Sequence, residues 1–256
     1  MNNKFIIITG MHRSGTSLIA SFIESAGVNL GSNLFPPDKG NPRGYFEDIT
    51  LVKLHNAVLK RNGLKYFFNK HPKPLVVSEE HRIAALQLVQ SMDHNKDDKV
   101  VGWKDPRASL FLEFWTGLLK NDGHFIVIFR KPGYVLDSLI RRKTDRAINK
   151  NPRIGLLSWY VYNKAIDNYL QHNNAILVEM EDVIEHSTNF INCINATYNL
   201  DLDQGDLNKF YKKGELNTSG KKLKFKTYLT MVLNPMLSWK SYKLYRKLRD
   251  SKTLLN

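Results

Sequence analysis

The sequence predicts a three-layer α/β fold in which a central parallel sheet is flanked by helices. Short apolar runs, most of them rich in Ile or Val, alternate with longer helical segments along much of the chain. The apolar runs are typical of parallel strands that are buried on both faces. A glycine-bounded turn joins the first apolar run to the first helical segment, and such turns can present backbone N–H groups to an anion.

Each element can be placed along the chain. The expected strands are residues 5–9, 100–103, 125–129 and 175–179. The expected helices are residues 17–26, 49–61, 79–92, 108–120, 133–142, 154–172 and 183–198. Residues 28–45 contain three prolines and three glycines, so they are expected to form a long loop. Loops of this length inside compact domains are often functional.

The bulk composition is that of a folded enzyme. The chain has 256 residues, of which 42% are hydrophobic and 11% aromatic, enough for one large α/β domain. Its single cysteine, Cys193, excludes an internal disulfide and is consistent with a reducing compartment. The start shows no signal-peptide pattern, and no apolar run approaches the ~20 residues of a membrane span. We therefore expect a cytoplasmic protein.

The net charge of +14 is unevenly distributed. Residues 1–208 carry 25 Lys and Arg against 22 Asp and Glu, whereas residues 209–256 carry 13 against 2. This division predicts an α/β domain over 1–208 and a basic, helical C-terminal extension over 209–256. No zinc-finger spacing, RNP motif or homeodomain-like helix is present, so nucleic acid is not the expected partner.

The turn at residues 10–17 predicts an anion site. Gly10 and Gly15 allow a sharp turn whose N–H groups point inward, and the following helix adds its positive end. A Walker A loop would place lysine at position 16, where this chain has Thr16. The basic residue, Arg13, instead precedes the second glycine. The loop can hold a phosphate without the lysine that kinases use.

The order basic-Ser-Gly-Thr-Ser resembles the 5′-phosphosulfate loop of the sulfotransferases that use PAPS (3′-phosphoadenosine 5′-phosphosulfate). The resemblance implies a P-loop-like three-layer fold and the transfer of a sulfonate group from PAPS to an acceptor hydroxyl, without a metal. It assigns the 5′-phosphosulfate to Arg13, Ser14, Gly15, Thr16 and Ser17.

A second motif resembles the 3′-phosphate site of the same family. Arg130 follows the third strand, Pro132 suits the first turn of a new helix, and Ser138 lies about two turns further on. An arginine can bind a phosphate with two parallel hydrogen bonds, and a serine can donate its hydroxyl. Taken alone, the motif also fits an ordinary surface arginine at a strand end.

A third motif contains Lys104, which ends the second strand. Asp105 can cap the next helix and Pro106 can occupy its first position. The Lys-Asp-Pro order is similar to one in the tyrosylprotein and bacterial glycan sulfotransferases. There a lysine stabilises charge on the transferring sulfonate and its bridging oxygen, and the resemblance gives Lys104 and Arg13 this role. The alternative is a surface lysine.

Two residues can serve as the catalytic base that takes the acceptor's proton. Glu47 matches the position of the base in the glutamate-using sulfotransferases, and we favour it. Its alternative role is that of an acid near the first turn of a helix. His55, eight residues on, is the rival base, in the manner of the cytosolic small-molecule enzymes. The remaining histidines show no metal-ligand spacing.

The last part of the chain leaves several interpretations open. Glu181 and Asp182 resemble a Glu-Asp pair after the family's late strand, although helix capping is their expected role. The family's C-terminal Arg-Lys-Gly motif has only Lys212, Lys213 and Gly214 as its nearest candidate. The basic and aromatic tail suits either a helix packed on the domain, which we favour, or an anionic membrane surface.

The acceptor is expected to be a glycan, a glycolipid or a small alcohol. Five aromatic residues in loop regions could line its site: Tyr45, Phe46, Tyr66, Phe67 and Phe68. The alternative functions are a P-loop kinase that phosphorylates a nucleotide or small metabolite and a non-catalytic adaptor at a membrane surface. A peripheral protein at the inner membrane surface would fit a lipid-linked acceptor.

Overall fold

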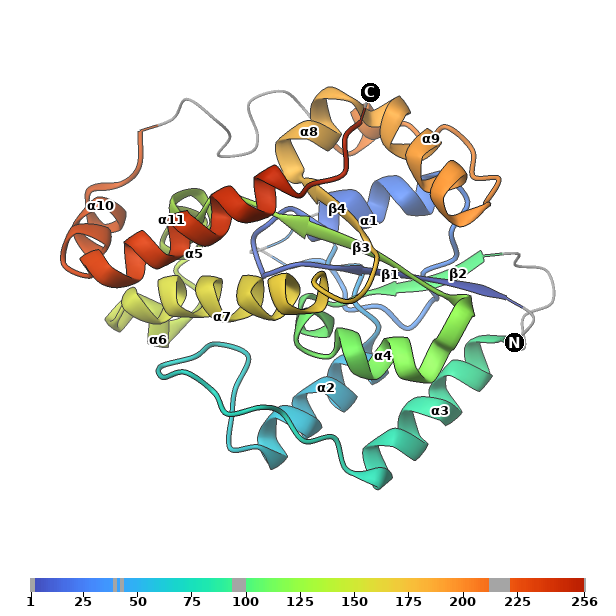
Figure 1. Ribbon diagram of the computed structural model, residues 1–256, viewed down its shortest axis with the longest axis horizontal. Coiled ribbons are helices and arrows are strands. Elements are labelled where there is room, and N and C mark those ends of the chain that lie inside the picture. The colour runs from blue at the N-terminus through green and yellow to red at the C-terminus, as the bar shows by residue number, and fades with distance from the viewer. Residues whose placement is uncertain (1–2, 39–40, 42–43, 94–99, 212–221, 256) are drawn as a thin grey trace.

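The computed structural model describes residues 3–38, 41, 44–93, 100–211 and 222–255. Their fold is a parallel four-stranded sheet between layers of helices (Figure 1). The strands lie in the order β2 (Val100–Lys104), β1 (Lys4–Thr9), β3 (Gly123–Phe129) and β4 (Ile176–Glu179). The expected fold class is confirmed, and each expected strand lies within two residues of an observed one.

Helices cover both faces of the sheet (Figure 1). One face carries α1 (Thr16–Ser25), α8 (Met180–Glu185) and α9 (Ser187–Tyr198). The core on the other face takes side chains from α2 (Ile49–Arg61), α3 (Glu79–Asp93), α4 (Leu112–Leu119), α5 (Pro132–Arg142), α6 (Arg146–Lys150), α7 (Arg153–Tyr169) and α11 (Pro235–Asp250). Short 3₁₀ helices occupy Pro106–Leu110 (η1), Lys120–Asp122 (η2) and Leu207–Lys209 (η3), and α10 is Phe225–Val232.

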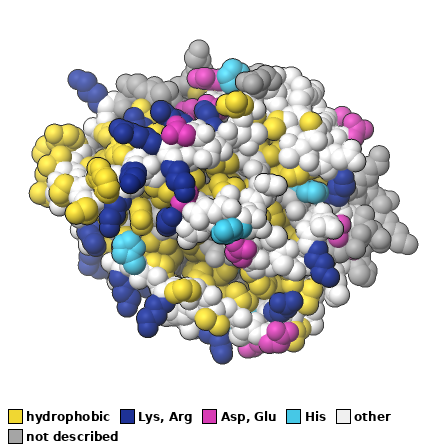
Figure 2. All heavy atoms as spheres, viewed as in Figure 1, with side chains coloured by type: hydrophobic (Ala, Val, Ile, Leu, Met, Phe, Trp, Pro, Cys, Tyr) yellow, Lys and Arg dark blue, Asp and Glu magenta, His cyan; other side chains and the backbone are white. Residues whose placement is uncertain are grey.

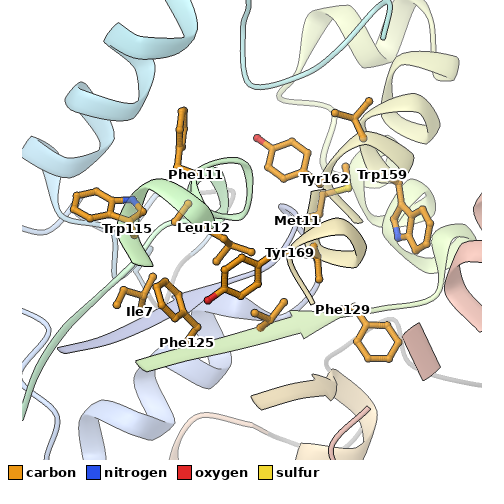
Figure 3. Packing of buried hydrophobic residues seen from close by; sticks show 14 of the residues in the cluster. Ile7, Met11, Phe111, Leu112, Trp115, Phe125, Phe129, Trp159, Tyr162 and Tyr169 are labelled. Atoms are coloured by element: carbon orange, nitrogen blue, oxygen red, sulfur yellow. The ribbon is translucent and has the colours of Figure 1, made fainter. Parts of the chain in front are cut away.

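Alternate residues of β1 enter two separate cores. Ile6 and Ile8 pack with residues of α1, α8 and α9, whereas Phe5 and Ile7 pack on the other face. The second core is rich in aromatic rings, and Figure 3 shows several of them above the sheet. The rings of Phe125 and Tyr169, for example, lie 5.7 Å apart between centroids. Both faces of the sheet are therefore covered by apolar side chains, and ligands must approach at the ends of the strands.

Two expected helices are interrupted. The segment 108–120 divides into η1 and α4 at Phe111, and the segment 183–198 divides into α8 and α9 at His186. In both cases the apolar residues keep a helical spacing on each side, so periodicity alone does not reveal a single non-helical residue. The short helix α6 was not expected.

The two helices of the C-terminal extension differ in their packing. α11 lies along α7 and buries Leu244, Tyr245 and Leu248. Beyond it, the Thr253 N–H donates to the Leu177 carbonyl at 2.7 Å, beside β4. α10 instead contacts α5 and leaves most of its apolar side chains exposed.

Candidate active site

The residues that the sequence singled out converge at the carboxyl ends of the strands. The loop 10–17 follows β1, Lys104 ends β2, and Arg130 follows β3 directly. Because the four strands are parallel, these ends meet at one edge of the sheet, where open α/β folds bind ligands.

Two glycines in the first loop permit contacts that a side chain would block. Gly10 has φ 141°, and a Cβ there would lie 1.9 Å from the Ile128 carbonyl oxygen. Gly15 has φ 95° and precedes α1, and its Cβ would lie 2.3 Å from the Met180 sulfur. No side chain caps α1 and its first turn holds no acid, so its positive end faces the loop uncompensated. This cradle fits an anionic group.

A pocket of about 200 Å³ opens beside this loop. Its polar lining includes Arg13, Ser17, Arg130 and Ser138, which come from separate elements. Arg13 Nε donates to the Ser138 hydroxyl at 2.9 Å. The two motifs that the sequence assigned to the 5′ and 3′ ends of one nucleotide thus line the same pocket. We call it the donor pocket.

Two guanidinium groups, those of Arg13 and Arg130, line the donor pocket. Burial, together with the neighbouring Arg142 and Arg130, lowers the pKa of Arg13 to about 10. Arg130 is 3% exposed, and its Nε donates to Glu181 Oε1 at 2.8 Å. An anion bound between these guanidinium groups would relieve their repulsion.

Sequence reasoning missed part of the donor pocket. Phe210, Tyr211, Leu18 and Met180 also line it. Phe46, which was expected to line the acceptor's site, lines the donor pocket instead. The flat aromatic rings of Phe46, Phe210 and Tyr211 suit a purine base. The two adjacent aromatic residues at 210–211 were visible in the sequence, but no pattern indicated that they lie close to the first loop. Lys212 and Lys213, the nearest candidates for the family's C-terminal motif, lie outside the described residues.

Lys104 connects the donor pocket to Glu47. It is 2% exposed, and its ammonium group donates to Glu47 Oε1 at 2.7 Å, to the Tyr45 carbonyl at 3.0 Å and to the Ser17 hydroxyl at 3.2 Å. Glu47 lies two residues before α2, which Asp48 caps by accepting from the N–H groups of Thr50 and Leu51. Lys104 is therefore not a surface lysine, and Glu47 is not a residue of the helix's first turn.

A second pocket, of about 290 Å³, lies on the other side of Arg13. We call it the acceptor pocket. Glu47 lines it, and Arg13 lines both pockets. The remaining residues of the acceptor pocket are His12, Tyr45, Tyr66, Phe67, Arg107, Leu139, Arg142, Thr144 and Asp145. A group held at Arg13 can therefore face both pockets.

His55 lies in a buried hydrogen-bond chain rather than in either pocket. Its Nδ1 is 2.7 Å from Asp105 Oδ2, and its Nε2 is 3.0 Å from Trp115 Nε1. An indole N–H only donates, so Nε2 accepts and the ring proton is assigned to Nδ1, where it is donated to Asp105. Both nitrogens are thus engaged. The ring also stacks on Phe111 with centroids 4.9 Å apart. This geometry argues against His55 as the base.

Arg107 joins this chain to Glu47 and was missed in the sequence. Its Nη1 donates to Asp105 Oδ1 at 2.7 Å and to Glu47 Oε2 at 3.3 Å. Burial opposes its charge, but Asp105 and Glu47 outweigh burial and raise the pKa of Arg107 above its usual value. Arg107 follows the Lys-Asp-Pro motif directly, so its proximity to Lys104 was the available signal.

His12 is a further missed residue of the acceptor pocket. Its ring lies among those of Tyr66, Phe67 and Tyr162, at centroid distances of 5.3, 5.5 and 5.9 Å. Burial, and then the charge of Arg107, lowers the pKa of His12 well below its usual value. Its Nε2 is buried and has no hydrogen-bond partner among the described residues.

The late Glu-Asp pair forms ion pairs. Glu181 pairs with Arg130, and Asp182 pairs with Lys252 of the C-terminal extension. Both acids lie in the first turn of α8, but no side chain caps that helix. Within the described part of the chain, no cluster of three His, Cys, Asp or Glu side chains could hold a metal ion.

No protein-family model matches the chain, and no curated protein matches it significantly. Several solved structures, in contrast, match the fold of this chain. The sulfotransferase domain from the curacin biosynthetic pathway superposes with a TM-score of 0.50 at 15% identity, over 92% of this chain and 98% of that one. The chain has a sulfotransferase fold. Sulfotransferase STF1 from Mycobacterium tuberculosis H37Rv gives a TM-score of 0.51 at 12% identity, over 94% of this chain and 76% of that one. The resemblance inferred from the loops is thus confirmed at the level of the sulfotransferase fold.

Proposed function

We propose that this protein is a PAPS-dependent sulfotransferase that transfers a sulfonate group from PAPS to a hydroxyl of an acceptor. The observation that carries the proposal is the meeting of two pockets at Arg13. One pocket has a phosphate-binding loop and two arginines, and the other has a carboxylate. Transfer between two bound molecules needs this adjacency, because proximity converts a bimolecular step into an effectively unimolecular one.

The donor pocket would hold PAPS through residues of the two loop motifs. The 5′-phosphosulfate would bind the N–H groups and side chains of residues 13–17. Arg130 and Ser138 would bind the 3′-phosphate, and the apolar surfaces of Phe46 and Phe210 would contact the base. PAPS supplies the sulfonate group and a leaving bisphosphate.

Residues of this chain would stabilise the developing negative charge and accept the proton of the acceptor hydroxyl. As the acceptor oxygen forms its bond to sulfur, the bond from sulfur to the bridging phosphate oxygen breaks, and Glu47 takes the hydroxyl proton. Lys104 and Arg13 stabilise the negative charge that develops on the leaving side. Fixed cations in a buried site are effective because they need no reorganisation during the reaction. The products are the sulfated acceptor and adenosine 3′,5′-bisphosphate.

A glycan or glycolipid is the acceptor that we propose. The acceptor pocket combines the aromatic rings of Tyr45 and Tyr66 with the charged groups of Arg142 and Asp145. Rings that contact a sugar face, with charged groups beside them for its hydroxyls, suit a polar cyclic molecule. We also propose a cytoplasmic location, because the single cysteine leaves no internal disulfide and suits a reducing compartment. Among the described helices, none has the length and apolar character required to cross a membrane.

The proposal is tested by the transfer of radiolabelled sulfonate from PAPS to a panel of glycans, glycolipids and phenols. Label on at least one acceptor is expected, and Glu47→Gln should slow its transfer by about a hundredfold or more. Glu80→Gln is the matched control, because Glu80 is exposed on α3. Phosphate transfer from Mg·ATP, with no sulfonate transfer from PAPS, would instead support the kinase alternative.

A further inference from the structure

Helix α10 packs on the protein mainly through polar side chains and exposes most of its apolar side chains to solvent. The side chains of α10 that face the protein are Thr227, which is fully buried, Thr230, which is 8% exposed, and the partly buried Met231. Thr227 donates its hydroxyl to Asp137 Oδ1 at 2.8 Å, and the Lys224 N–H donates to the same oxygen at 2.7 Å. The hydrogen bonds to Asp137 thus fix the polar face of α10 against α5.

The other apolar side chains of α10 point to solvent. Phe225, Tyr228, Leu229 and Val232 are 76, 61, 40 and 52% exposed. Their spacing of three and four residues places them on one face of the helix. The exposed apolar surface continues through three further side chains across the turn and the start of α11: Leu233, Met236 and Trp239. We call these seven residues the apolar tip.

The apolar tip is unlike ordinary exposed apolar residues. Single ones are common on soluble proteins, whereas a contiguous group of large side chains marks a binding surface. Figure 2 shows the apolar surface over α10, at the left, with Lys and Arg side chains beside it. Between residues 222 and 249 the sequence contains eight Lys and Arg and no Asp or Glu.

We propose that the apolar tip inserts into the interfacial layer of an anionic lipid bilayer, with the surrounding lysines against the lipid head groups. Apolar and aromatic side chains with a basic rim have the composition of an interfacial membrane helix. Trp239 is 59% exposed, and the ammonium of Lys243 lies 5.3 Å from its ring centroid. Tryptophan favours the membrane interface because its ring is apolar and its N–H polar.

The charge favours lipid over a second copy of this chain. In a two-fold dimer the same surface would meet itself, which would bring the exposed Lys222, Lys226 and Lys240 toward their equivalents. Like charges across an interface are unfavourable. An anionic membrane presents the opposite charge to the same lysines.

The first experiment is co-sedimentation of the full chain with vesicles. We expect binding to vesicles that contain phosphatidylglycerol, weaker binding at high salt, and little binding to pure phosphatidylcholine. The variant Tyr228→Ser/Trp239→Ser should lose about tenfold or more in partitioning, because it removes apolar side chains from the interfacial layer. Lys240→Gln/Lys243→Gln should also lose about tenfold or more, because it removes two charges that attract anionic lipid. Val76→Ser is the control, because Val76 is 66% exposed away from the tip.

Tryptophan fluorescence gives an independent readout. The chain has four tryptophans, and Trp103, Trp115 and Trp159 are fully buried. A blue shift on adding anionic vesicles therefore reports Trp239, and Trp239→Phe should abolish it while binding persists. The proposal is overturned if anionic vesicles produce neither binding nor a shift, or if the control and the tip variants bind alike. It is also overturned if the tip variants abolish self-association of the chain and leave vesicle binding unchanged.

Discussion

The ammonium of Lys104 lies 2.7 Å from Glu47 Oε1, although the two residues are 57 positions apart in the sequence. The same ammonium lies 3.2 Å from the hydroxyl of Ser17 in the donor loop. One buried cation thus contacts both the group that we assign to the acceptor's proton and the loop that we assign to the donor. This contact makes the roles of the two pockets testable separately.

Glu47→Gln should lower kcat for sulfonate transfer by about 10²- to 10⁴-fold, the usual contribution of a general base. Affinity for adenosine 3′,5′-bisphosphate should change little, because Glu47 does not line the donor pocket. Steady-state kinetics and bisphosphate titration of the same preparation separate the two effects. A variant with the normal kcat would show that another group takes the proton.

Arg130→Ala should weaken the binding of adenosine 3′,5′-bisphosphate about 10- to 100-fold, the worth of hydrogen bonds to a charged group. The binding of AMP, which lacks the 3′-phosphate, should be nearly unchanged. Lys131→Ala is the matched control, since Lys131 is the adjacent cation and does not line the donor pocket. Equal losses for both nucleotides would place Arg130 elsewhere on the ligand.

His55→Ala should reduce the free energy of unfolding by about 2–4 kcal/mol, because it leaves a cavity and removes one hydrogen-bond partner of buried Asp105. The remaining folded enzyme should keep kcat within about tenfold of the unmodified protein. Chemical denaturation, with assays well below the melting temperature, measures both quantities. A thousandfold loss of kcat with unchanged stability would restore His55 as the base.

Stability should depend on pH through His12. Its folded-state pKa lies below the ordinary value of 6.5. Above pH 6.5 the ring is neutral in both states, and its contribution to stability is complete. Below pH 6.5 the unfolded chain binds a proton that the folded protein excludes, so stability falls until the pH passes the folded pKa.

His12→Phe fits the same aromatic surroundings and removes this titration. Its loss of unfolding free energy between about pH 7 and pH 5 should be smaller than that of the unmodified protein by about 1–2 kcal/mol. His172→Phe is the control, because His172 is exposed. Identical pH profiles for His12→Phe and the unmodified protein would contradict the burial of a neutral ring.

The fold could be predicted because its signals are local. The four strands are apolar runs bounded by turns, and Pro132 begins α5 as its fixed φ angle favours. The interruption at Phe111 could not be predicted, since one residue with φ −127° does not alter the apolar spacing.

The candidate site was predicted only in part, because some of its contacts are tertiary. The first loop and Lys104 carry recognisable spacing. The role of His55 depends on Trp115, which lies 60 residues away, and the role of Arg107 depends on a carboxylate 60 residues before it. A single sequence contains no pattern that indicates contacts between residues so far apart in the chain.

Both the donor site and the reaction that we propose require the donor pocket to bind a 3′-phosphorylated adenine nucleotide. Its most direct test is calorimetric titration of the full chain with adenosine 3′,5′-bisphosphate in the presence of a metal chelator. We expect saturable binding at one site, tighter than that of AMP and weakened by Arg130→Ala. The absence of heat at saturating bisphosphate, with binding only of Mg·ATP, would contradict it.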